Sequence, residues 1–148
     1  MVIPWAEIQT KAHWWDTHFL SIDYGFGRSS AAAHLHVCLQ DGRIVTVFEM
    51  MVQHTSAYDF ARELVRRFDL KGERSRPGER NNIVLVYLDP SNFKNIGDGH
   101  TIADQINEVL APCELGAIEA SNDRIGGWQL MYQMLARGRW LIADTCHC

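Results

Sequence analysis

Long apolar runs are missing from this sequence. No stretch approaches the ~20 continuous apolar residues that a membrane-spanning helix needs. The N-terminus, MVIPWAEIQT, has neither the basic start nor the apolar stretch of a secretory signal peptide. We therefore expect an intracellular protein without a membrane partner. Cysteine is scarce as well, at four residues, and in a reducing compartment we expect these to be free thiols.

Two further absences exclude whole classes of function. Lys and Arg number 14 against 18 Asp and Glu, so the formal charge is -4 and a uniformly basic nucleic-acid-binding surface is excluded. The sequence Gly-Lys-Ser/Thr occurs nowhere in the chain. Because that sequence holds the phosphates in P-loop motors, we expect no ATP-driven motor activity from this chain.

The composition is that of one ordinary globular domain. Hydrophobic residues make up 47% and charged residues 22% of the 148 positions, with no internal repeat or linker. A chain of this length buries enough surface to fold without a disulfide or a metal. We expect a single domain over residues 1–148, in which residues 1–18 form a lead-in segment.

Three strand candidates come first. They are residues 20–24, 31–39 and 43–50, and Asp41-Gly42 lies between the second and the third. Asp-Gly between two β-prone runs is a strong hairpin signal. The sequence therefore predicts an antiparallel meander.

The rest of the chain alternates helices with strands. The pattern predicts a helix at 57–68, a loop at 69–82, a strand at 83–88, a helix from Thr101 to just before Pro112, a strand at 117–120, a helix at 124–137 and a strand at 140–143. The strand at 83–88 is apolar on both faces, so we expect it to be a buried central strand. We assign Met131, Met134 and Leu135 to the core. This order predicts an α/β fold of the ribonuclease-H-like type, with helices on both faces of a mixed sheet. A doubly wound domain with an added hairpin has a similar order.

Asp23 and Asp89 each terminate an apolar strand candidate. If the two strands are neighbours, both carboxylates lie at the edge where α/β folds place their sites. A carboxylate there is costly to ionise without a positive partner, and Mg²⁺ or Mn²⁺ favours such oxygen ligands. Two such ions can cleave a phosphodiester by activating water and stabilising the leaving oxygen. The pair is a candidate metal site, with ordinary turn and loop capping as the alternative.

Several motifs resemble the C-terminal nuclease domain of the large terminase subunit of tailed bacteriophages, above all in their order and spacing. They are Ser21-Ile22-Asp23-Tyr24-Gly25-Phe26-Gly27, the hairpin ending in Phe48-Glu49, Val86-Tyr87-Leu88-Asp89-Pro90, and Ala120-Ser121-Asn122-Asp123-Arg124 followed by residues 126–144. The resemblance covers nearly the whole chain from Ser21 onward. It implies a metal-dependent endonuclease that cuts concatemeric double-stranded viral DNA during packaging, in the cytoplasm of a bacterial host. The family's partners are the terminase ATPase domain, the small terminase subunit and the portal.

The resemblance also implies roles for single residues. Asp23 and Asp89 match the family's first and second acidic metal ligands and are the implied catalytic residues, with Mg²⁺ or Mn²⁺ as cofactor. The family's third acidic ligand follows a further helix, so we expect this chain to be truncated at its C-terminus and to bind the second ion weakly. Asp144 is the last acidic side chain and the remaining candidate for the third ligand.

One segment carries a local excess of positive charge. Residues 62–80 contain seven Lys or Arg and four Asp or Glu. Within its loop, Arg74, Arg76 and Arg80 are candidates for sequence-independent contacts with DNA phosphates. A solvated helix face and a charged loop are the alternative explanation.

Two other functions fit parts of the sequence. Without a third carboxylate, the chain could be a catalytically incomplete prophage remnant, or an assembly or DNA-binding module with the same fold. Residues 23–27 also fit the phosphate loop of an actin-like ATPase. That fold needs a second nucleotide-binding half, which 148 residues do not contain.

Overall fold

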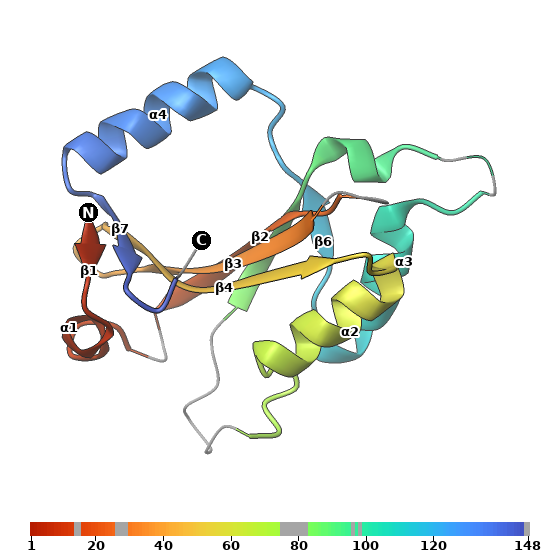
Figure 1. Cartoon of the computed structure of the whole chain (residues 1–148), viewed down its shortest axis with the longest axis horizontal. Helices are drawn as coiled ribbons and strands as arrows, with labels where there is room; N and C mark the ends of the chain where they lie inside the picture. Colours follow the sequence, from red (N-terminus) through yellow and green to blue (C-terminus); the bar gives the residue numbers. More distant parts are fainter. Residues whose placement is uncertain (14–15, 26–29, 75–82, 96, 98, 147–148) are drawn as a thin grey trace.

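The computed structural model describes residues 1–13, 16–25, 30–74, 83–95, 97 and 99–146. These residues form a mixed seven-stranded sheet with helices on both faces, as predicted (Figure 1). The strands lie in the order β1-β7-β4-β3-β2-β5-β6. Among the described residues, no helix has the length and apolar character needed to cross a bilayer.

The predicted meander is confirmed. Strands β2 (Thr17–Asp23), β3 (Ser30–Cys38) and β4 (Ile44–Gln53) pair in antiparallel fashion along the chain. Gly42 has a φ of +79° at the β3–β4 turn, and a Cβ there would lie 2.7 Å from the Arg139 guanidinium, so this turn requires glycine.

The parallel part of the sheet lies on both sides of the meander. Strand β5 (Ile83–Leu88) pairs with β2, and β6 (Ala117–Glu119) pairs with β5. On the other side, β7 (Trp140–Ala143) pairs with β4. The expectation that β5 is buried on both faces is wrong, because Val84 is 50% and Leu85 is 38% exposed.

The lead-in segment contains two elements that the sequence analysis does not predict. Strand β1 (Val2–Ile3) extends the sheet beyond β7, and helix α1 (Trp5–Gln9) places Ile8 in the core at 1% exposure. Elements of two and five residues are too short to show a hydrophobic period.

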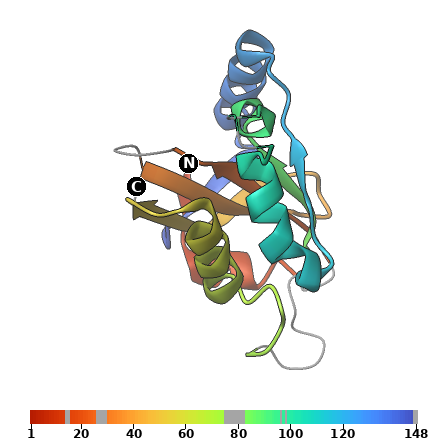
Figure 2. The same ribbon diagram turned by 90° about the vertical axis from the view of Figure 1, so that its right-hand side faces the viewer.

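Helices α2 (Ala57–Arg67) and α3 (Ile102–Leu110) lie side by side on one face of the sheet (Figure 2). The predicted caps are present: Ser56 Oγ accepts the N–H of Asp59 at 3.1 Å, and Thr101 forms a capping box with Asp104. The helices bury their apolar stripes against the strands and form the core. Its largest fully buried side chains include Phe60, Leu64, Ile106, Leu110, Leu20, Leu35 and Leu88.

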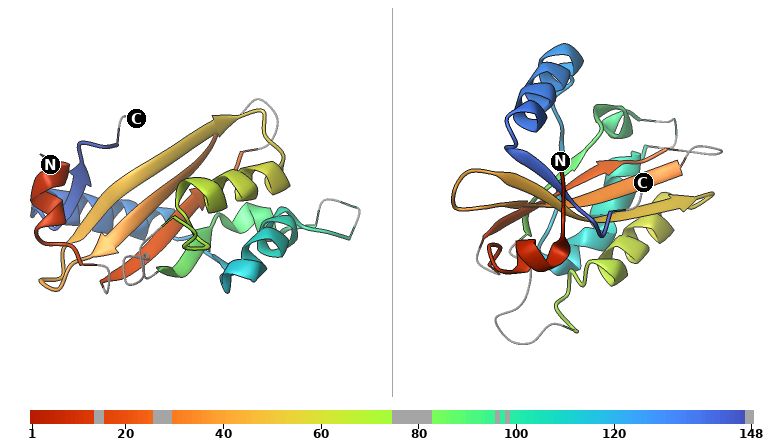
Figure 3. Two further views of the ribbon diagram at one scale, coloured as in Figure 1. Left: turned by 90° about the horizontal axis from the view of Figure 1, so that it is seen from below. Right: turned by 60° about the vertical axis from the view of Figure 1, so that its left-hand side comes forward.

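Helix α4 (Arg124–Ala136) lies on the opposite face of the sheet from α2 and α3 (Figure 3). The assignment of Met131, Met134 and Leu135 to the core is wrong: all are at most half-buried, and no residue of α4 is buried. The helix is apolar around its whole circumference and has its main contacts with β7 alone. Apolar composition therefore did not indicate burial here.

Two short 3₁₀ helices complete the fold. The first, η1 (Pro90–Phe93), follows β5 directly, and the second, η2 (Ala111–Cys113), continues α3. Pro90 and Pro112 each lie in the first turn of their element, where a missing N–H has no cost. The tight turn of η1 places the residue that precedes it, Asp89, at the edge of the sheet.

Candidate functional site

The structure brings Asp23 and Asp89 to the same edge of the sheet. Strands β2 and β5 are parallel neighbours, with Ile22 opposite Leu88. Asp23 is the last residue of β2, and Asp89 directly follows β5. Adjacent strands lie about 4.8 Å apart, so the two carboxylates extend from neighbouring backbones.

The alternation of β2 turns Asp23 away from the core. Leu20 and Ile22 are buried at 0% and 5% exposure, whereas Asp23 lies on the opposite face and is exposed. Ala32 is its cross-strand neighbour on β3, and this small side chain leaves the carboxylate accessible. The next residue, Tyr24, is buried again and donates its hydroxyl to the carbonyl oxygen of Thr55 at 2.7 Å. The strand end is thus anchored on both sides of Asp23.

Asp89 is the N-cap of η1. Its Oδ1 accepts hydrogen bonds from the hydroxyl of Ser91 and from the Ser91 backbone N–H, the latter at 2.8 Å. These bonds, with the positive charges of Arg124 and Lys94 adding to them, hold the pKa of Asp89 below its ordinary value. The group is therefore an anion at neutral pH.

The structure does not bring Asp144 to this pair. Strand β7 is separated from β2 by β4 and β3, which is about 14 Å across the sheet at ~4.8 Å per strand. Asp144 Oδ1 instead accepts the backbone N–H of Trp5 at 2.9 Å. It satisfies a donor in the first turn of α1 that has no partner within the helix.

A third acidic ligand is not found in the described part of the chain. There, no group of three or more His, Cys, Asp or Glu side chains is placed to hold a metal ion. Asp23 and Asp89 therefore form a pair, and the sequence expectation of only two ligands from this chain describes their arrangement.

The predicted DNA contacts lie elsewhere or outside the described residues. Arg76 and Arg80 belong to the segment 75–82, which the structure does not describe. Arg74 forms an ion pair with Asp69 at 3.7 Å and donates from its guanidinium to the carbonyl oxygen of Arg66. The structure thus places the Arg74 side chain against α2, on the face that α2 and α3 cover.

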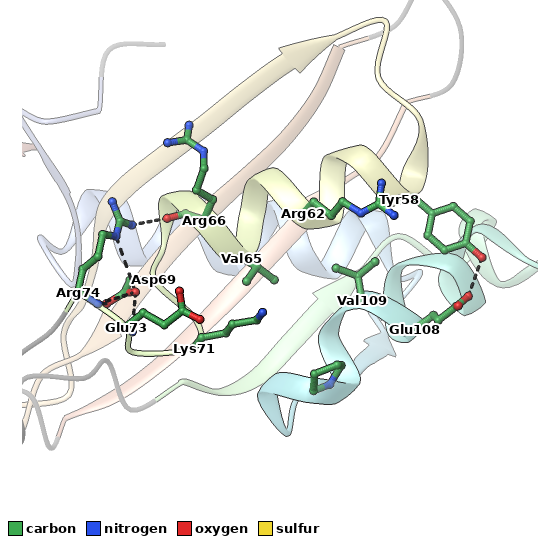
Figure 4. Close-up of a pocket in the computed structure, with 11 residues that line it drawn as sticks. Tyr58, Arg62, Val65, Arg66, Asp69, Lys71, Glu73, Arg74, Glu108 and Val109 are labelled. Carbon is green, nitrogen blue, oxygen red and sulfur yellow. Dashed lines mark hydrogen bonds and ion pairs between the residues drawn. The ribbon is translucent and has the colours of Figure 1, made fainter.

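Arg74 is part of the rim of a groove of about 740 Å³ between α2 and α3 (Figure 4). Val65, Val109 and Pro112 supply its apolar lining. The lining cations Arg62, Arg66 and Arg74 pair with Asp59, Glu63 and Asp69, respectively. The groove therefore has a largely compensated charge.

A hydrogen-bonded chain crosses the sheet on the face that carries Asp23. Ser21 Oγ lies 2.8 Å from His36 Nε2, and His36 Nδ1 lies 2.9 Å from Thr46 Oγ1. Trp140 Nε1 donates to the same Thr46 oxygen at 3.0 Å. The chain links β2, β3, β4 and β7 through side chains. Sequence reasoning missed it, because such contacts depend on strand order and register.

His36 lies at the centre of this chain and is 4% exposed. Its ring stacks on Phe19 with centroids 4.6 Å apart. Burial, with the neighbouring His34 adding a smaller effect, lowers the pKa of His36 to about 4. The imidazole is therefore neutral at physiological pH.

Comparison with known proteins shows the fold. No protein-family model and no curated protein matches the chain. The full-length large terminase of a thermophilic bacteriophage is similar at a TM-score of 0.67 and 19% identity, covering 98% of this chain and 32% of that chain. The large terminase nuclease from a second thermophilic phage, G20c, gives a TM-score of 0.57 and 9% identity, covering 90% of this chain and 62% of that chain.

A viral protein of a different origin has the same architecture. The human cytomegalovirus terminase nuclease domain matches at a TM-score of 0.56 and 10% identity, over 88% of this chain and 65% of that chain. The chain therefore has the ribonuclease-H-like fold of terminase nuclease domains, as predicted. It spans about a third of the length of the full-length phage terminase.

Proposed function

We propose that this chain is a metal-dependent endonuclease domain of the terminase type that cuts double-stranded, concatemeric viral DNA during packaging. The observation that carries the proposal is the placement of Asp23 and Asp89 at the same edge of two parallel strands. The fold shared with terminase nucleases supports it. In this proposal the ATPase domain, small terminase subunit and portal are partners in the cytoplasm of a bacterial host.

The donor chemistry of the pair fits Mg²⁺ or Mn²⁺. Both residues offer carboxylate oxygens, which these hard cations prefer. The Ser91 bonds of Asp89 both end on Oδ1, so Oδ2 is left for an ion. Asp23 is exposed, and none of the described residues donates a hydrogen bond to its side chain. When bound, the metal would activate water and stabilise the charge on the leaving oxygen.

The two carboxylates differ in their proposed tasks. Asp89 is held by η1 and by an anion-stabilising environment, so it supplies a fixed ligand. Asp23 lies on an accessible strand end, where the ion and a DNA phosphate can both approach. Lys94 and Arg124, whose charges act on Asp89, offset the repulsion between the acidic pair and the DNA backbone.

Plasmid cleavage tests the proposal directly. Incubating the chain with supercoiled plasmid and Mn²⁺ or Mg²⁺ should produce nicked and linear DNA, whereas excess EDTA should leave the plasmid supercoiled. Gel electrophoresis over a time course measures both outcomes. Equal cleavage with and without EDTA would contradict metal dependence.

The second candidate function is a catalytically incomplete remnant or a DNA-binding assembly module. The lack of a third acidic ligand among the described residues favours it. A folded chain that binds DNA but leaves plasmid intact at every Mn²⁺ concentration would support this alternative over the endonuclease.

Asp144 provides a test that separates a structural from a catalytic carboxylate. Asp144→Ala removes the acceptor for the Trp5 N–H and should lower the free energy of unfolding by about 1 kcal/mol, as loss of a helix cap does. Asp144→Asn keeps an acceptor oxygen and should cost less. Urea denaturation measures both variants. Cleavage should remain within about twofold of wild type, and a large loss with Asp144→Asn would return Asp144 to the metal site.

A further inference from the structure

Helix α4 exposes an unusually apolar surface. Its most exposed large side chains are Ile125 at 76%, Tyr132 at 74%, Trp128 at 68% and Leu130 at 59%. Solvent-exposed apolar patches of this kind mark interaction sites. Two of these side chains are aromatic and combine a flat apolar face with a polar edge.

The charge of this region identifies the chemistry of its partner. Residues 124–143 contain three Arg and no Asp or Glu, whereas the remaining chain has 11 Lys or Arg and 18 Asp or Glu, a charge of -7. Arg139 donates to the carbonyl oxygen of Gly42, but Arg124 is exposed and forms no ion pair within the described residues. Cations beside exposed aromatic rings complement a nucleic-acid strand, which presents phosphates and base faces.

The start of α4 lies beside the acidic pair. Strand β6 pairs with β5 up to Glu119 opposite Leu88, and the N–H of Ala120 donates to the Leu88 carbonyl oxygen at 2.9 Å. The chain then enters α4, where Asp123 caps the helix by accepting the N–H of Gly126 at 2.9 Å. Arg124 is the first helical residue, and its charge acts on Asp89.

The helix extends the site away from this edge in one direction. Trp128 and Tyr132 follow Arg124 at intervals of four residues, so these three side chains lie along one face of the helix. With 13 residues, α4 is about 20 Å long, which matches about six nucleotides of one strand at ~3.4 Å each. Figure 1 shows that the helix runs from the β6 side of the sheet back towards β7.

We propose that α4 is the DNA-binding helix of this domain: Arg124 binds a backbone phosphate beside the Asp23–Asp89 pair, and Trp128 and Tyr132 pack on the adjoining nucleotides. The proposal deepens the endonuclease function and rests on it. It moves the DNA from the Arg74 loop to the opposite face of the sheet. A second copy of the chain is the competing occupant of this surface.

Binding measured in EDTA tests this proposal without requiring cleavage. Fluorescence anisotropy of a labelled 30-mer, as duplex and as single strand, would compare wild type with Arg124→Gln and Trp128→Ala. Arg124→Gln should weaken both arms and reduce the slope of log K against log salt concentration by about 0.7–0.9. Trp128→Ala should weaken single-strand binding by about 5- to 100-fold, and Trp128→Phe should restore most of it.

The controls separate this surface from general electrostatics. Arg62→Gln makes the same chemical change at an exposed helical Arg on the opposite face. Equal effects of Arg124→Gln and Arg62→Gln, or no DNA binding by wild type, would overturn the proposal. So would a dimer in sedimentation that Trp128→Ala dissociates while DNA binding stays unchanged. Normal binding through α4 without metal-dependent cleavage would overturn only the endonuclease function.

Discussion

Replacing Asp23 by Asn is expected to reduce metal-dependent plasmid cleavage by about a thousandfold or more. Asn has nearly the same shape but lacks the negative charge that holds a divalent cation. Metal ions supply several kcal/mol of transition-state stabilisation, and each ~1.4 kcal/mol is tenfold in rate. Because Asp23 is exposed at the end of β2, the substitution should leave the core packing unchanged. Initial rates of plasmid nicking in Mn²⁺ measure the effect.

Asp41→Asn is the matched control for this experiment. It makes the same chemical change at the β3–β4 turn, where Asp41 pairs with Arg43 at 2.7 Å on the opposite edge of the sheet. We expect cleavage near the wild-type rate from this control. Titration calorimetry with Mn²⁺ should show weakened binding in Asp23→Asn and in Asp89→Asn. Wild-type cleavage and Mn²⁺ binding in both site variants would remove the carboxylate pair from the mechanism.

The second large effect is a loss of stability in acid that originates at His36. In the unfolded chain an imidazole takes up its proton near pH 6.5, whereas the buried His36 has a pKa of about 4. Between these pH values the unfolded state binds more protons, so the free energy of unfolding falls as the pH is lowered. A difference of this size corresponds to about 3 kcal/mol across the interval. Above pH 6.5 both states are neutral and the effect vanishes.

Urea denaturation at a series of pH values from 7 to 4 would measure this loss. His36→Gln should lower stability at neutral pH, because it disturbs the bonds to Ser21 and Thr46, but should reduce the fall in acid. His54→Asn is the control, since His54 is exposed and Asn tolerates its φ of 52°. His18, whose pKa is also lowered by burial, adds a fall of the same sign in every variant. An unchanged pH dependence in His36→Gln would assign the acid loss to other groups.

The sequence predicts the fold where an element is long enough to show its period. The stripe of α2, with Phe60 and Leu64 buried, and the Asp41-Gly42 hairpin are both predictable for that reason. Helix α4 shows the limit of the method. Its apolar residues have no preferred face, so composition alone suggests burial, and only the observed exposure of the helix contradicts it. Strand β1 and helix α1 are too short to detect.

For the candidate site, residue type and strand position identified Asp23 and Asp89. Their proximity required only that β2 and β5 be neighbours. Asp144 also follows a strand, but β7 lies beyond β4, and the order of strands in a sheet is a tertiary property that local patterns do not specify. The role of Arg124 is not predictable for the same reason. Its position beside Asp89 depends on how β6 returns to β5.

The position of β7 has a consequence for folding during synthesis. The meander β2–β4 consists of contacts between neighbouring segments and can form as soon as it leaves the ribosome, whereas β4 gains its partner β7 only after residue 140 is made. Until then one edge of β4 presents unpaired N–H and C=O groups, which is the arrangement that favours aggregation. Val2 and Ile3 must wait equally long for their partners in β7. The domain is therefore most vulnerable to misassembly just before its last strand emerges.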